Sequence, residues 1–174
     1  MRLQTARLLL RPFAPGDRDA IHAVYADADV MRYVGNGPHR TLEETDAALR
    51  IYGDVLAREG YSFLAVCERE SGTLIGDGGL YPLGGQGPDV ELGYTLARDA
   101  WGHGYATELG RALVDYAFDE LRVQRVVAQV EPMNAASRRV LKKLGMSERE
   151  LRTAYGRPHV FYVVEREARG QAAR

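Results

Sequence analysis

The sequence contains a single cysteine, Cys67, among its 174 residues. No disulfide can form within one chain, and a zinc site built from several thiolates is excluded. Ala65 and Val66 precede Cys67, so we expect its thiol to be buried in a strand rather than to act as a nucleophile. The four histidines show no spacing typical of metal ligands, and no metal site is predicted.

The sequence also lacks a long hydrophobic run and an excess of basic residues. No apolar stretch approaches the roughly 20 residues of a membrane-spanning helix. Arg7 and Arg11 flank the leucines that follow the N-terminus, which argues against a signal peptide. A formal net charge of −1 offers no broad basic face for nucleic acid or an anionic membrane. We therefore expect a cytoplasmic protein with neither as a partner.

The composition is that of an ordinary soluble domain, with 45% hydrophobic and 27% charged residues. We predict one domain over residues 1–167 and a frayed tail over 168–174. Alternation and turn residues predict strands, and a 3.6-residue periodicity predicts helices. The expected strands are 3–13, 61–69, 73–83, 90–96, 125–130, 147–152 and 160–164. The expected helices are a short one at 21–25, one at 42–58, one after the glycines to about 121, and a short one after Asn134. The fold class is therefore α/β, with a mixed order of elements.

One stretch organises the chain: Trp101-Gly102-His103-Gly104-Tyr105-Ala106-Thr107-Glu108. It follows an expected strand and opens an amphipathic helix, so backbone N–H groups and the positive end of a helix dipole meet there. Such a place binds anions, most often phosphate. A dinucleotide-binding turn would have a third glycine at Thr107, and a P-loop would end in Gly-Lys-Ser/Thr. Neither design fits this stretch well.

Three motifs, in this order, carry a resemblance to a known family. They are Thr5-Ala6-Arg7-Leu8-Leu9-Leu10-Arg11-Pro12-Phe13, then Glu91-Leu92-Gly93-Tyr94 leading into the glycine stretch, and then Asn134, Ser137 and Leu141-Lys142-Lys143-Leu144-Gly145-Met146. The chain resembles the GNAT superfamily of N-acetyltransferases, and within it the branch of ribosomal-protein N-terminal (alanine/serine) acetyltransferases. The resemblance implies a single mixed, mostly antiparallel sheet of six to seven strands. This sheet would open between strands 4 and 5 and carry about four flanking helices.

The resemblance implies acetyl-CoA as the cofactor. Backbone N–H groups from Gly102 to Thr107 would hold the pyrophosphate. The pantetheine arm would pair with the main chain of Tyr94 and Leu96, and a bulge would free an amide near Leu92 or Gly93 to polarise the thioester carbonyl. The predicted cofactor-binding residues are Tyr94, Thr95, Leu96, Trp101, Gly102, His103, Gly104, Tyr105, Ala106, Thr107, Asn134, Ser137, Arg139 and Lys142.

The reaction implied is direct attack of a primary amine on acetyl-CoA in a ternary complex. Glu91 is the candidate base, and Asp77 and Asp89 are lesser candidates. The alternative for Glu91 is a solvent-exposed carboxylate at the strand edge or a member of a structural ion pair. Many relatives carry a tyrosine where this chain has Leu141, so Ser137, one turn earlier, is the candidate that faces the thiol. A local hydrogen bond near the helix start would explain Ser137 equally well.

The acceptor is expected to be a small-molecule amine or a protein N-terminus. Its binding is assigned to Glu91 and to the loop-like segments 29–40 and 153–159, and the candidate side chains are Met31, Tyr33, Asn36 and Tyr81. Anchoring of the loop to the core is the alternative role of the apolar ones. Homodimers are frequent among the relatives. Two other functions stay open: a coenzyme A-binding or regulatory module without catalysis and, less favoured, a dinucleotide-dependent oxidoreductase.

Overall fold

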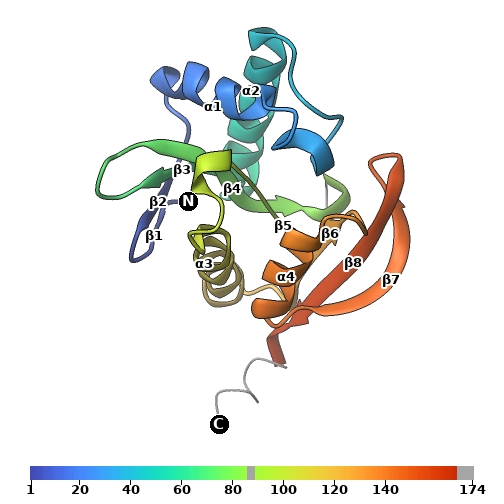
Figure 1. Cartoon of the computed structure of the whole chain (residues 1–174). Helices are drawn as coiled ribbons and strands as arrows, with labels where there is room; N and C mark the ends of the chain where they lie inside the picture. The colour runs from blue at the N-terminus through green and yellow to red at the C-terminus, as the bar shows by residue number, and fades with distance from the viewer. Residues whose placement is uncertain (86–88, 168–174) are drawn as a thin grey trace.

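The structure is a computed structural model that describes residues 1–85 and 89–167. Within these residues the strands form one eight-stranded sheet in the order β1-β2-β3-β4-β5-β6-β8-β7 (Figure 1). The strands are β1 Leu3–Gln4, β2 Leu8–Arg11, β3 Phe63–Glu68, β4 Leu74–Pro82, β5 Val90–Leu96, β6 Arg125–Val130, β7 Ser147–Ala154 and β8 Arg157–Glu165. The predicted tail at 168–174 lies outside the described residues, and so do residues 86–88 of the glycine-rich connection.

The α-helices are α1 Arg18–Ala26, α2 Leu42–Glu59, α3 Tyr105–Asp119 and α4 Ala135–Lys143. Local signals set their ends. Thr41 Oγ1 accepts the N–H of Glu44 at the start of α2, and Gly60 ends that helix with φ 79°. Asp17 directly precedes α1 without capping it, because its carboxylate accepts the N–H of Ala14 and pairs with Arg11. None of the described helices combines the length and apolar character needed to cross a membrane.

The expected strand at 3–13 is two strands, which is why the sheet has eight strands rather than six or seven. A tight turn interrupts it, in which Thr5 N–H donates to Leu8 O at 2.9 Å. The segment 153–159 was expected to be a loop, but only Tyr155 and Gly156 lie outside strands. Their φ angles are 51° and 73°, as a two-residue hairpin turn requires. Cys67 is buried in β3, as predicted, and is 2% exposed.

Helices cover both faces of the sheet: α1 and α2 lie on one side, and α3 and α4 on the other (Figure 1). The main core lies beneath α3 and α4, where Leu92 and Leu96 of β5 pack with Leu109 and Leu113 of α3 and Leu141 of α4. Successive side chains of a strand point to opposite faces. Even-numbered residues of β5 therefore face α3 and α4, and odd-numbered ones face α1 and α2.

The sheet opens between β5 and β6, as the resemblance implied. These are the fourth and fifth expected strands, because the first expected strand is split into β1 and β2. These strands run parallel and pair only at Val90 with Val126 and at Glu91 with Val127. Beyond Glu91 they separate, while β5 stays paired with β4 along its whole length. No register shift interrupts that pairing, so the expected bulge is absent from the described β4–β5 ladder. The remainder of β5 therefore presents a free edge toward β6.

Candidate active site

The free edge of β5 carries main-chain groups whose direction follows from the ladder with β4. Ala97 N–H donates to Ile75 O at 2.8 Å, and Leu83 N–H donates to Asp89 O at 3.0 Å. Hydrogen-bonded pairs alternate in an antiparallel ladder, so the odd-numbered residues of β5 bond to β4. The N–H groups of Leu92, Tyr94 and Leu96 consequently point into the opening. An extended ligand can add to such an edge as a further strand.

The same geometry corrects two of the expected contacts. The main chain of Gly93 faces β4, so its amide does not point into the opening. The main chain of Thr95 likewise pairs with Asp77 of β4. The Thr95 side chain is buried on the face of α1 and α2, away from the glycine turn. The carbonyl oxygen of Leu96 already accepts Trp101 Nε1 at 2.8 Å. Leu96 therefore offers its N–H at this edge.

The glycine turn leads from the opening to the start of α3. Gly102 and Gly104 have φ angles of 79° and 81°, the left-handed region that favours glycine. Both glycines and His103 between them are exposed. The N–H of Thr107 donates to Gly104 O at 3.1 Å, so this amide is used within the helix and not by a ligand. The amides before Thr107 lie at the positive end of α3, where they are placed to donate to an anion.

Residues of the N-terminal motif form hydrogen bonds and an ion pair with this turn and with the first turn of α3. Glu108 Oε1 accepts Thr5 Oγ1 at 2.6 Å and Arg7 N–H at 2.8 Å, while its other oxygen pairs with the Arg7 guanidinium at 2.7 Å. The guanidinium also donates to His103 O at 2.9 Å. These bonds therefore hold the turn between β1 and β2 against the glycine turn at residues 102–104, which we name the phosphate turn after its predicted ligand. No single motif of the sequence indicates this link, because its partners are about a hundred residues apart.

Helix α4 reaches the opening from the α3 side. Asn134 Oδ1 accepts the N–H of Ser137 at 3.1 Å and so caps the short helix that was predicted to follow Asn134. Tyr94 O–H donates to Ser137 Oγ at 3.2 Å, so the first turn of α4 touches β5. Leu141 is buried in the core and offers no hydroxyl here. Two predicted phosphate contacts, Arg139 and Lys142, are exposed on the outer side of α4.

Glu91 occupies the point where β5 and β6 part, on the face of α1 and α2. Burial raises the pKa of its carboxyl group above the ordinary value, and hydrogen bonds from Tyr155 and Gln129 offset part of that rise. The Tyr155 hydroxyl donates to Glu91 Oε2 at 3.0 Å. Tyr81 lies opposite Glu91 in the β4–β5 ladder. Glu91 is therefore no ion-paired surface residue but a half-buried carboxylate among polar and aromatic groups.

The two segments expected to contact the acceptor do meet. Arg157, after the hairpin turn, donates to Gly35 O at 2.6 Å and pairs with Glu131 at 2.6 Å. Asn36 is exposed beside this contact, and Tyr33 is half-buried. Met31 is different: it is 3% exposed and packs against α1 with Tyr25 and Val24, so it anchors the loop instead of lining a site.

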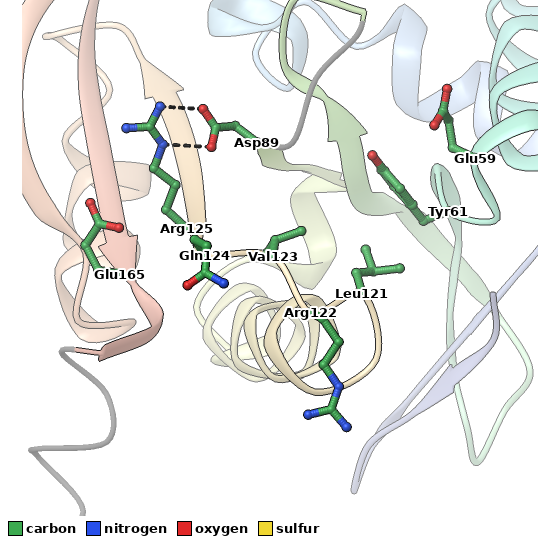
Figure 2. A pocket seen from close by; sticks show the side chains of 9 residues that line it. All are labelled: Glu59, Tyr61, Asp89, Leu121, Arg122, Val123, Gln124, Arg125 and Glu165. Atoms are coloured by element: carbon green, nitrogen blue, oxygen red, sulfur yellow. Dashed lines mark hydrogen bonds and ion pairs between the residues drawn. The ribbon is translucent and has the colours of Figure 1, made fainter.

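The lesser base candidates lie elsewhere. Asp77 is buried beneath α1, where Tyr25 O–H donates to its Oδ2 at 2.9 Å, and burial raises its pKa to about 6. Asp89 accepts both arms of the Arg125 guanidinium (Figure 2). This pair lies at the other end of β5, in a depression lined by Glu59, Tyr61, Asp89, Leu121, Arg122, Val123, Gln124, Arg125 and Glu165. Among the described residues no cluster of metal-binding side chains occurs.

A sheet opened beside a glycine turn and a helix N-terminus, with exposed cations on the next helix, forms a site suited to an extended ligand that carries phosphate groups. A family model described as an acetyltransferase (GNAT) domain matches residues 7–147. The chain belongs to the GNAT family of N-acetyltransferases and transfers the acetyl group of acetyl-CoA to an amine. The dinucleotide-dependent oxidoreductase alternative is thereby discarded.

Similar proteins cover the chain almost completely. An N-acetyltransferase of Bacillus licheniformis named p20 and described as uncharacterized is 28% identical over 97% of this chain and 98% of its own length. The crystal structure of an acetyltransferase from Agrobacterium tumefaciens str. C58 is 29% identical, covers 95% of each chain and superposes with a TM-score of 0.81. The aminoglycoside acetyltransferase AAC(6')-Ib in complex with coenzyme A shares the fold, with a TM-score of 0.80 at 22% identity over 96% of this chain and 99% of its own.

Proposed function

We propose that Glu91 is the general base of this acetyltransferase. An amine acceptor is an ammonium ion at neutral pH and must lose a proton before it attacks. A carboxylate whose pKa is raised by burial takes up that proton more readily than an exposed one. Glu91 also lies where β5 and β6 part, within reach of the free main-chain edge. This placement is the observation that carries the proposal.

The main chain of β5 would hold the thioester. The ladder with β6 ends at Glu91, and the N–H of Gly93 faces β4. Tyr94 is therefore the first residue whose amide points into the opening and is clear of a β6 partner. We assign this N–H to the carbonyl oxygen that gains charge during the attack. The N–H of Leu96, two residues later, would pair with the pantetheine arm.

The amine and the cofactor would approach from opposite faces of the sheet. Glu91, Tyr81 and Tyr155 lie on the face of α1 and α2, so the acceptor would enter there. The phosphate turn and Ser137 lie on the side of α3 and α4, with Arg139 and Lys142 exposed for the 3′-phosphate. Both substrates would then be bound together, as direct transfer in a ternary complex requires.

The acceptor class we propose is a primary amine, either of a small molecule or of a protein N-terminus. Glu91 supplies one carboxylate beside the aromatic side chains, whereas Glu131 is already paired with Arg157. The segments that would select the acceptor are the loop up to Asn36 and the β7–β8 turn. A cytoplasmic location and a homodimer stay predictions.

The test is an acetylation screen of amines and peptides with free N-termini, read by mass spectrometry. We expect Glu91→Gln to lower kcat/KM at neutral pH by at least about 100-fold, the usual contribution of a general base. The gain in melting temperature on adding acetyl-CoA should persist in this variant. Glu165→Gln, in the depression at the far end of the sheet, is the matched control and should keep the parental rate. Full activity of Glu91→Gln would refute the assignment.

A further inference from the structure

Two hydroxyl groups meet where the sheet opens. Tyr94 projects from β5 and Ser137 from the first turn of α4, and the phenol donates to Ser137 Oγ at 3.2 Å. Both side chains are half-buried, and Tyr94 packs against the main core. The contact therefore joins the strand that carries the free edge to the helix that faces it.

The direction of this hydrogen bond decides what Ser137 can do. A serine hydroxyl accepts with its lone pairs and donates its own single hydrogen. Tyr94 occupies the accepting side, and Asn134 fixes the backbone of Ser137. Among the described residues, the hydrogen of Ser137 Oγ has no acceptor. Burial raises the pKa of Tyr94 by more than the hydrogen bond with Ser137 lowers it, so the phenol stays protonated and is able to donate.

Helix α4 offers no other hydroxyl to a thiolate in the opening. Leu141, one turn after Ser137 on the same face, is apolar and 3% exposed. The amide of Tyr94 points into the opening as well, so the backbone and the side chain of one residue border the same space. In surroundings of low dielectric, a hydroxyl group that accepts a hydrogen bond becomes a stronger donor, because hydrogen bonds in a chain polarise one another.

We propose that Tyr94 is a positioning residue for the leaving thiolate and acts through Ser137. Its hydroxyl holds Ser137 Oγ so that the serine hydrogen points at the sulfur. The amine enters this step neutral, because Glu91 has already passed the first proton of the ammonium ion to solvent. As the new C–N bond forms and the C–S bond breaks, the electron pair goes to the sulfur, and the second proton leaves the nitrogen for Glu91. Tyr94 and Ser137 keep their protons and stabilise the thiolate, which takes a proton from solvent on release. This inference rests on the proposed function.

A double-mutant cycle tests the relay, with Tyr94→Phe, Ser137→Ala and the double variant. Ser137→Ala should lower kcat about tenfold, the loss expected for one hydrogen bond to a charged group. Tyr94→Phe should lower kcat by no more than that, because Tyr94 reaches the thiolate only through Ser137. The KM for acetyl-CoA should stay within about twofold, because the main-chain contacts persist. The double variant should be no slower than Ser137→Ala, because Tyr94 acts only through the serine. Tyr116→Phe on α3 is the control and should keep the parental kcat.

A change of leaving group separates this role from a structural one. In the selenium analogue of acetyl-CoA the leaving selenolate is a weaker base and needs less stabilisation, so the deficit of Tyr94→Phe should shrink. The inference would be overturned if Tyr94→Phe lowered kcat equally with the sulfur and the selenium cofactor, or if it lowered kcat equally with and without Ser137. A change confined to KM would overturn it as well. No deficit in Tyr94→Phe would overturn this inference alone. Failure of the parental enzyme to acetylate any amine would overturn the proposed function with it.

Discussion

Replacing Tyr155 by phenylalanine removes the hydrogen bond to Glu91 Oε2 and keeps the aromatic ring. The bond is 3.0 Å long and favours the ionised carboxylate. Without it, the pKa of Glu91, already raised by burial, should rise further. A general base works in its ionised form, so the variant should lose activity at a higher pH than the parent as the solution is acidified.

The size of the shift follows from the strength of the bond. A hydrogen bond to a charged group contributes about 1.5–3 kcal/mol when it is buried. Tyr155 is 59% exposed, and solvent screening reduces this contribution to about 1 kcal/mol. One pKa unit corresponds to about 1.36 kcal/mol, so the pKa of Glu91 should rise by about 0.7 unit.

The assay is the pH dependence of kcat/KM for one amine acceptor with both proteins. The acid limb of the profile should move up by about 0.7 pH unit, while the plateau at higher pH is nearly unchanged. Tyr116→Phe, whose ring lies on α3, should leave the limb in place. An acid limb that stays fixed or moves to lower pH in Tyr155→Phe would refute Glu91 as the titrating base.

Three further changes probe the rest of the account. Burial raises the pKa of Asp77 from 3.8 to about 6, so ionised Asp77 destabilises the fold as the pH rises through this window. The free energy of unfolding of Asp77→Asn relative to the parent, from urea unfolding, should therefore increase by about 2.4 kcal/mol between about pH 4 and 7, and a constant difference would contradict this. Gly104→Ala should lose about 1 kcal/mol of stability and also weaken acetyl-CoA binding. Gly72→Ala, at a similar φ of 71° in an open turn, should lose stability but keep its affinity for acetyl-CoA. Equal affinities of Gly104→Ala and Gly72→Ala for acetyl-CoA would contradict phosphate binding at the glycine turn. Glu108→Gln weakens the brace to Arg7 and should raise the KM for acetyl-CoA several-fold at nearly constant kcat, whereas a change in kcat alone would argue against that role.

Helix ends were predictable because their signals are local. Thr41 with Glu44, Asn134 with Ser137, and Gly60 after α2 each act within four residues of one another or of their helix. The opening between β5 and β6 came from the resemblance to a family, because residue patterns alone do not say which strands pair. The extra strand and the missing 153–159 loop follow from tight turns at 5–7 and 155–156, whose geometry no periodicity reports.

The parts of the site that could not be predicted depend on contacts between distant segments. The direction of the amides at Gly93 and Tyr94 is set by the register with β4, which is known only once that pairing is known. Tyr155 reaches Glu91 from a hairpin turn 64 residues later. Met31 lies in a loop-like sequence, but a single 3₁₀ turn at Met31–Tyr33 buries it against α1. Side-chain partners across elements thus decide roles that residue types alone leave open.

Amide hydrogen exchange along β5, with and without acetyl-CoA, tests the central claim that this cofactor binds on the free edge between β5 and β6. The even-numbered amides of Tyr94 and Leu96 should exchange quickly in the free protein and become strongly protected when acetyl-CoA is added. The odd-numbered amides of Gly93 and Thr95 already bond to β4 and should be slow in both states. Unchanged exchange at Tyr94 and Leu96 in the presence of saturating acetyl-CoA would contradict the account.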